Sequence, residues 1–363
     1  MTRLAARLGP NRSSVYAHMP ATRHHRSASV GIGLFLLSAT LYFSFTLLAV
    51  TAPFWWLQGA AGLAAGFQIG LLFVIGHDAC HESLTPSRLI NRLIATLCFL
   101  PAWHPYSTWR YTHNGLHHGW TNVRGKEIVY TPFSKDQYDR LPAWRQRAER
   151  WFRSPVGVAT FYFFTVFLWH EILPSRARGP KGRGWQAFQW ERLLVICFGM
   201  VLFLGSYVYA ERMERMPWWS LTCAVLIPAL CYFSLFSVVT FLHHTHPRAP
   251  WFDLEAYEYF DILRATVHVE FPRPIEIILH EILQHTAHHA DTRIPLYRLN
   301  TSQLALESAF PRDIIHEPWS WSSYLRTMQT CRLFDYEKHC WLDWDGTALT
   351  PPLLSSTILI PSN

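Results

Sequence analysis

Charge and cysteine are both scarce in this sequence. Lys, Arg, Asp and Glu together make up only 16% of the 363 residues. The seven cysteines are scattered and include no Cys-x-x-Cys pair, which excludes a ferredoxin-type cluster and indicates free thiols in a reducing compartment. No Lys/Arg run interleaved with aromatic residues is present, so we expect no nucleic-acid partner. Flavin and haem motifs are also absent.

Apolar residues, in contrast, are abundant and lie in long runs. Half of the residues are hydrophobic, and the 17 Trp and 15 Tyr are side chains typical of a membrane–water boundary. Four runs stay nearly uncharged over about the length that a bilayer requires, namely residues 31–50, 54–75, 193–210 and 218–242. Short polar turns join them in pairs. We therefore predict an all-α integral membrane protein with four transmembrane helices in two hairpins and a cytosolic helical cap.

The distribution of charge predicts the orientation of these hairpins. The formal net charge is +7, and the two hairpin turns carry only Arg212 and Arg215. The other Lys/Arg-rich segments lie on the opposite side, which the positive-inside rule places in the cytoplasm. We divide the chain into a cytoplasmic basic tail (1–29), a membrane domain (30–310) and a C-terminal cytoplasmic extension (311–363). The tail contains Arg3, Arg7, Arg12, Arg23 and Arg26.

The segments outside the four runs are too short, too interrupted or too rich in charge to cross a membrane. Residues 89–103 and 158–169 are apolar but too short or too interrupted to span, so we expect interfacial or buried segments. The Arg-rich stretch 140–153 is typical of a helix lying on lipid headgroups. Near the C-terminus we expect helices at 275–290 and 300–308, followed by Trp/Tyr-rich loops.

Histidines form three clusters with i, i+3 or i, i+4 spacing, which places their side chains on one face of a helix. In the second cluster this spacing predicts His113 and His117 on one face, with His118 beside them. All clusters lie just beyond the ends of the apolar runs or in the same cytosolic region. They comprise His77 and His81; His113, His117 and His118; and His285, His288 and His289, with a further group of His243, His244 and His246 after the fourth run.

Eight or nine imidazoles exceed what one tetrahedral zinc needs and suit two metal ions with open positions. Nitrogen ligands accept Fe, Zn, Cu or Ni, so ligand type alone does not identify the metal. A pair of irons that binds O2 beside a membrane would be a coherent oxidant for C–H bonds. Neutral imidazoles leave the metal charge uncompensated, so nearby carboxylates should orient the rings. The candidates are Asp78, Glu82, Glu127, Asp261, Glu281 and Asp291.

The three boxes, their order and their placement after paired apolar runs resemble the integral-membrane fatty-acid desaturase family, in particular its Δ12/ω-6 and ω-3 branch with the bacterial relatives. The matching motifs are His-Asp-x-x-His at 77–81, Trp-Arg-x-x-His…His-His at 109–118, Leu-His-His-Thr-His-Pro at 242–247 and His-x-x-His-His at 285–289. The resemblance covers roughly residues 30–310.

This resemblance implies a four-span, mushroom-like fold with a cytosolic di-iron site and O2-dependent removal of two hydrogens from a fatty acyl chain. Since the family has Gln at the position of His243, the resemblance favours His244 as the ligand, and the choice between the two stays open. His246 and His280 are implied to lie behind the ligands. The implied metal ligands are His77, His81, His113, His117, His118, His244, His285, His288 and His289.

The implied partners are membrane lipid, a fatty acyl substrate and an external electron donor such as a small acidic ferredoxin, because the chain has no redox motif of its own. The predicted location is a bacterial inner membrane, with both termini in the cytoplasm. Three alternatives remain open. The same metal site could serve an acyl hydroxylase or acetylenase, or a carotenoid ketolase or hydroxylase. The non-enzyme alternative is a zinc-binding membrane protein.

Overall fold

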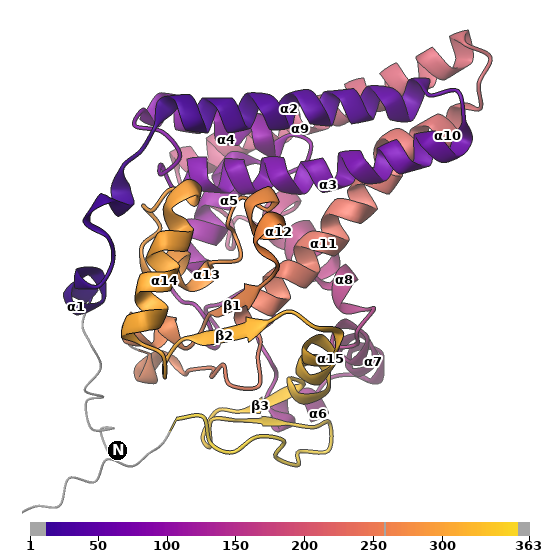
Figure 1. Ribbon diagram of the computed structural model, residues 1–363. Helices are drawn as coiled ribbons and strands as arrows, with labels where there is room; N and C mark the ends of the chain where they lie inside the picture. The colour runs from indigo at the N-terminus through magenta and orange to yellow at the C-terminus, as the bar shows by residue number, and fades with distance from the viewer. Residues whose placement is uncertain (1–11, 258, 355–363) are drawn as a thin grey trace, which may run out of the picture.

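Four long apolar helices organise the fold (Figure 1). The computed structural model describes residues 12–257 and 259–354. Each of the four is long and apolar enough to cross a membrane, and the predicted mostly helical fold is confirmed. They are α2 (Ala28–Thr51), α3 (Trp55–Cys80), α9 (Arg183–Arg212) and a last helix that runs from Pro217 to His244 as α10 (Pro217–Leu221), the π-helical turn η4 (Thr222–Leu226) and α11 (Ile227–His244).

The four helices form two antiparallel hairpins whose turns lie at the same end of the molecule (Figure 1). The guanidinium of Arg215, in the second turn, donates hydrogen bonds to the backbone carbonyls of Val50 and Ala52 in the first turn, at 3.2 and 2.7 Å. The opposite ends of α3 and α11 therefore reach the cap together. This arrangement brings His77 and His244, which are distant in sequence, to the same level.

The close approach of α3 to the last helix depends on glycine. A Cβ added at Gly66 would lie 2.6 Å from the Cβ of Cys231 and 2.7 Å from the carbonyl oxygen of Pro228. Small residues at such contacts let two helix backbones approach within a membrane, where packing rather than water exclusion drives association. The contact between α3 and α11 is thus set by the absence of a side chain at this position.

We expect Gly66→Ala to destabilise the protein by about 1–3 kcal/mol, because the added methyl group overpacks a contact between two backbones. Gly70 lies one turn further along the same helix, and a Cβ there would meet nothing within 4 Å. Gly70→Ala is therefore the matched control. Thermal unfolding of the purified variants in detergent measures the difference, and equal melting temperatures for the two variants would contradict this packing argument.

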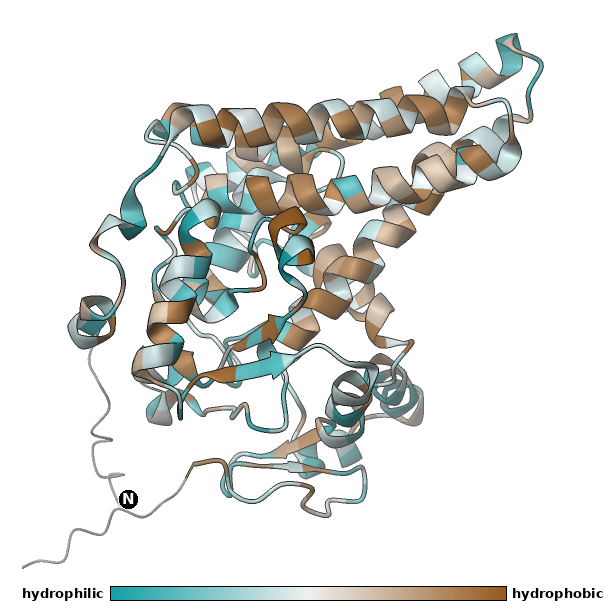
Figure 2. Ribbon diagram, viewed as in Figure 1, coloured by the Kyte–Doolittle hydropathy of each residue, from teal (hydrophilic) through white to brown (hydrophobic). Residues whose placement is uncertain are grey.

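The cap is built from short helices between and after the hairpins, and is visibly more hydrophilic than the four long helices (Figure 2). The amphipathic helix α4 exposes Leu89, Leu93 and Leu97, four residues apart, on one outward face, as an interfacial helix would. The central cap elements are α4 (Arg88–Phe99), α5 (Tyr106–Trp109), the π-helix η2 (Arg110–His117), α6 (Lys135–Asp139), α7 (Ala143–Phe152), α8 (Val158–Phe161) and the π-helix η3 (Tyr162–Ile172).

The C-terminal part of the chain departs from two predictions. The predicted helix at 275–290 is broken, because His280 and Glu281 have positive φ angles of 54° and 59°. The predicted loops after residue 308 are wrong, since this part contains a helix and three strands. The elements are η5 (Leu254–Ala256), η6 (Tyr259–Leu263), β1 (Val267–Glu270), α12 (Arg273–Ile278), α13 (His285–Ala290), η7 (Leu296–Arg298), α14 (Leu299–Ala309), β2 (Ile315–Pro318), α15 (Trp321–Thr330), β3 (Leu333–Asp335) and β4 (Cys340–Leu342).

Strands β1 and β2 come together from distant parts of the chain, whereas β3 and β4 form a local hairpin. Strand β1 pairs in parallel with β2, with Val267 opposite Ile315, and β3 pairs antiparallel with β4. A parallel pair joins segments that are far apart in sequence, so neither member shows a local hairpin signal. Around β3 and β4, the fully buried Trp251 and Trp341 pack with Phe334 into a small second core.

The described part of the basic tail packs against the cap. It contains α1 (Arg12–Ala17) and the 3₁₀ turn η1 (Ala21–His24), and it buries Val15 in the main hydrophobic core. The Arg23 and His24 side chains both contact the Asp291 carboxylate, at 3.4 and 2.7 Å. This tail is therefore tied to the segment that follows the third histidine box. Arg3 and Arg7 lie outside the described residues.

Candidate metal centre

The nine histidines predicted as ligands lie together in two clusters where α3, η2, α11 and α13 meet. Within each cluster the ring nitrogens that could bind one ion all lie within 4.8 Å of one another. The first cluster is the more exposed of the two, and the second is entirely buried. The five-histidine cluster contains His77, His81, His113, His118 and His288, and the four-histidine cluster contains His117, His244, His285 and His289.

Both His-His pairs of the sequence are divided between the two clusters. His118 and His288 belong to the five-histidine cluster, whereas their neighbours His117 and His289 belong to the other. Successive side chains on a helix point in different directions, so each pair can serve two sites at once. In each pair, one peptide bond joins a residue of one cluster to a residue of the other. This short covalent link limits the distance between the two clusters.

The second box departs from the predicted α-helix. Residues Arg110–His117 form a π-helix, and the backbone N–H of His118 donates to the carbonyl of His113 at 3.0 Å, five residues back. His113 and His118 therefore share a cluster, while His117, four residues from His113, belongs to the other. The rings of His113 and His117 stack with centroids 5.1 Å apart, so they are neighbours as predicted, but their ring nitrogens belong to different clusters.

The donor set fits metal ions. Ring nitrogens approach to 3.0 Å for His113 and His118, 3.1 Å for His118 and His288, and 2.9 Å for His244 and His285. Nitrogen ligands at 2.0–2.1 Å from one ion lie about 3 to 4 Å apart, so these spacings match a shared ion. The Nε2 atoms of His81 and His289 are also buried without any hydrogen-bond partner among the described residues. Each has a lone pair free for coordination.

The protonation of the rings also suits metal binding. Burial lowers the pKa of His113, His118, His285, His288 and His289 well below the ordinary value of 6.5, and the neighbouring imidazoles lower it further. A charged imidazolium cannot bind a metal, whereas neutral imidazole presents one lone pair. The environment therefore keeps these rings in the form that coordinates.

Three side-chain or backbone oxygens orient rings of the four-histidine cluster. The Glu127 carboxylate lies 2.7 Å from Nδ1 of His117, and it also accepts the backbone N–H groups of Ile128 and Val129. The Thr121 hydroxyl lies 3.1 Å from Nδ1 of His289, and the Ala265 carbonyl lies 3.3 Å from Nδ1 of His244. Such partners fix the tautomer and the direction of the remaining nitrogen. The sequence singled out Glu127 but offered no signal for Thr121 or Ala265.

The other candidates are buried near the centre or bound to other groups. The Asp78 carboxylate accepts the Leu296 N–H at 3.2 Å, and Asp261 is buried. The Nε2 atom of His280 is buried, and no described residue forms a hydrogen bond with it. The remaining pairs are Glu82 with Arg88 and Arg110, His246 with Glu317, Glu281 with Arg273, and Asp291 with Arg23, His24 and Arg293.

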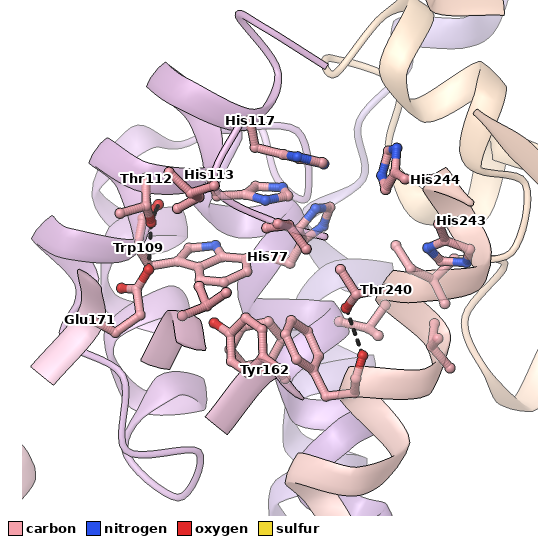
Figure 3. Close-up of a pocket in the computed structure, with 18 of the residues that line it drawn as sticks. His77, Trp109, Thr112, His113, His117, Tyr162, Glu171, Thr240, His243 and His244 are labelled. Carbon is pink, nitrogen blue, oxygen red and sulfur yellow. Dashed lines mark hydrogen bonds between the residues drawn. The ribbon is translucent and has the colours of Figure 1, made fainter. Parts of the chain in front are cut away.

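An apolar cavity abuts both clusters (Figure 3). Rings of His77, His113 and His117 line one side, and Tyr162 and Thr240 lie opposite them (Figure 3). Most of the remaining wall is hydrocarbon, from Phe73, Val74, Trp109, Ile128, Val129, Val166, Phe236, Val239 and Ile282. The cavity therefore offers a mostly apolar surface for a flexible alkyl chain beside both histidine clusters.

One carboxyl group interrupts this apolar wall. Glu171 is buried and receives a hydrogen bond from the Thr112 hydroxyl at 2.5 Å, drawn in Figure 3. Its other oxygen, Oε2, has no hydrogen-bond partner among the residues that the structure describes. Burial raises the pKa of the Glu171 carboxyl to about 7, although the hydroxyls of Thr112 and Thr108 lower it. No motif in the sequence points to this residue, which lies in the apolar stretch that forms η3.

His243 also lines the cavity, outside both clusters. Its ring stacks on that of His285 with centroids 3.8 Å apart, and its buried Nε2 has no hydrogen-bond partner among the described residues.

We expect His244→Ala to lose bound metal and His243→Gln to retain it, because only His244 lies among converging ring nitrogens. Metal analysis of the two purified variants distinguishes them, and metal loss from His243→Gln alone would reverse the assignment.

Comparison with known proteins agrees with this geometry. A family profile described as fatty acid desaturase matches residues 18–320. The chain is 28% identical over 307 residues to the chloroplastic omega-6 fatty acid desaturase of Glycine max, covering 84% of this chain and 68% of that protein. It is 27% identical over 296 residues to the sn-1 oleoyl-lipid 12-desaturase of Picosynechococcus sp., covering 81% of each. The protein of the same name from Synechocystis sp. is 25% identical over 292 residues, with 78% of each covered.

Proposed function

The chain belongs to the fatty acid desaturase family, and on that premise we propose that it uses two irons and O2 to introduce a double bond into the acyl chain of a membrane lipid. The single observation that carries this proposal is the contact between the apolar cavity and both histidine clusters. A zinc-storage or structural role would not need a hydrocarbon chamber at the metal positions.

The overall reaction defines what the protein must supply. One saturated –CH2–CH2– unit and O2, with two electrons and two protons from outside, give –CH=CH– and two molecules of water. Two irons held by the nine histidines would supply the oxidising power of bound O2. Every other requirement falls on the chain itself: it must position one pair of methylenes, exclude bulk water and admit protons.

The residues around the cavity meet these requirements in different ways. The hydrocarbon walls from α3, η3 and α11 bind the alkyl chain without directional bonds, so the fit along the chain decides which carbons lie against the clusters. Burial favours the protonated form of the Glu171 carboxyl on this wall, and the Thr112 hydroxyl donates a hydrogen bond that holds the carboxyl in place. Glu127 keeps the His117 ring in one orientation.

The names of the relatives guide the substrate proposal. Because two relatives act on an oleoyl group of a lipid, we infer that the substrate is a monounsaturated acyl chain esterified to a glycerolipid. We also infer that the cap faces the cytoplasm, since the turns at the far end of the hairpins carry only Arg212 and Arg215. A small acidic electron-transfer protein would then reach the more exposed five-histidine cluster from that side.

Lipid analysis of a host that expresses the protein tests the proposal. The expected result is a new diunsaturated acyl species in membrane lipid that is absent when the host expresses His288→Ala at the same level. A hydroxylated or acetylenic acyl species would instead show that the same centre performs a different oxidation. Unchanged acyl lipids and carotenoids, together with tightly bound zinc in the purified protein, would overturn the enzyme proposal.

A further inference from the structure

A cationic cavity lies where the N-terminal tail joins the first long helix. It has a volume of about 690 Å³ and is open to the outside. It lies between the tail, the loop after the first histidine box and η7, and the cavity that abuts the metal centre shares none of its residues. The lining residues are His24, His25, Arg26, Ser27, Val30, Pro86, Tyr297 and Arg298.

Two guanidinium groups in this cavity form no close ion pair within the described part of the chain, and Arg26 is attracted only at longer range by the Asp78 carboxylate. Among the described residues, no carboxylate forms an ion pair with Arg26 or Arg298, and Nε of Arg26 is buried without a hydrogen-bond partner. The nearby Asp291 carboxylate already contacts Arg23, His24 and Arg293. Leaving a guanidinium donor buried and unpaired is costly, so an anion in the cavity would relieve that cost.

The position of the cavity identifies which anion can reach it. Ser27 caps α2, its hydroxyl accepting the Val30 N–H at 3.3 Å, and α2 is long and apolar enough to cross a membrane. The positive end of this helix therefore points toward the cavity, at the level where α2 enters the bilayer. Beyond it, the exposed Leu37 and Leu41 continue along α2 as surface for hydrocarbon.

We propose that this cavity binds the phosphate of an anionic glycerophospholipid, whose acyl chains lie along the exposed side chains of α2. Arg26 and Arg298 donate to the phosphate oxygens from two sides, as paired guanidinium forks commonly do. The apolar side chains of Val30 and Pro86 face the glycerol and upper chain region. The site does not depend on the oxidation chemistry, so it can be present even if the proposed function is wrong.

Binding measurements on the purified full-length protein in neutral detergent test this site. Native mass spectrometry with added phosphatidylglycerol, phosphatidylcholine or inorganic phosphate reports which ligand is retained. We expect phosphatidylglycerol to bind the wild type, and Arg26→Gln with Arg298→Gln to weaken that binding about 10- to 30-fold. The matched control replaces the exposed Arg248 and Arg312 of the cap by Gln, which removes the same charge elsewhere.

The outcomes separate the alternatives. Loss of binding in the site variant with retention in the control supports the proposal. Equal loss in both variants, or equal retention of phosphatidylcholine, would show a non-specific charge or detergent effect and overturn it. Full competition by millimolar inorganic phosphate would assign the cavity to a soluble anion instead. Melting temperatures without lipid verify folding, and Arg298→Lys, which keeps the charge, should restore part of the affinity.

Discussion

Replacing His288 by Ala is expected to abolish turnover and to remove the metal ion of the five-histidine cluster, leaving close to one iron per chain instead of two. The ring of His288 lies on α13, with Nε2 at 3.1 Å from that of His118 and fully buried beneath the cap. Changes to residues that only orient a ligand typically cost 10- to 100-fold in metal affinity or activity. Loss of a ligand should therefore reduce turnover by more than about 100-fold.

Iron content and acyl-lipid turnover, measured on the same purified preparation, check this expectation. His285→Ala, in the four-histidine cluster, should also remove one iron and leave the other, which tests the division into two sites. His18 is exposed and distant from both clusters, so His18→Ala is the control for a histidine change in itself. Two irons and full turnover in His288→Ala would refute its assignment as a ligand.

The parts of this protein that follow from local sequence were predictable. A run such as residues 31–50 must form a helix in a bilayer, because only a helix satisfies its own backbone hydrogen bonds there. The short turn at 51–53 then forces a hairpin. The same reasoning places His77 on the cap side, at the end of the second long helix. The i, i+4 spacing of His285 and His289 also predicts a helix there, and both residues lie on α13. These features depend on contacts within a few residues.

What could not be predicted depends on contacts between distant segments. The π-helix that pairs His113 with His118 differs from an α-helix by one hydrogen-bond step, which the residue types do not specify. Thr121 reaches His289 across 168 positions in the sequence, and β1 pairs with β2 only because the cap folds back on itself. Asp291, expected near the metal, instead ties down the N-terminal tail.

Replacing Glu171 by Gln is expected to lower turnover about 100-fold without loss of iron. The reaction consumes two protons beside a mostly apolar cavity, and general acids typically contribute 10²- to 10⁴-fold. Glu171 lines that cavity and lies in neither cluster, so its removal should not affect metal binding. The Gln side chain has the same size as Glu and can accept the hydrogen bond from Thr112, but it has no acidic proton to donate to the reaction.

The pH profile separates proton delivery from a structural role. Because burial raises the pKa of Glu171 to about 7, the carboxyl is protonated below that pH and loses its proton above it. Wild-type turnover should therefore fall as the pH rises through about 7, and the Gln variant should lack this limb. Thr112→Val removes a hydroxyl whose hydrogen bond lowers the pKa of the Glu171 carboxyl, so this variant should keep the acid and shift the alkaline limb to higher pH. An unchanged alkaline limb in Glu171→Gln, or loss of iron from it, would remove Glu171 from proton delivery and leave it a packing role.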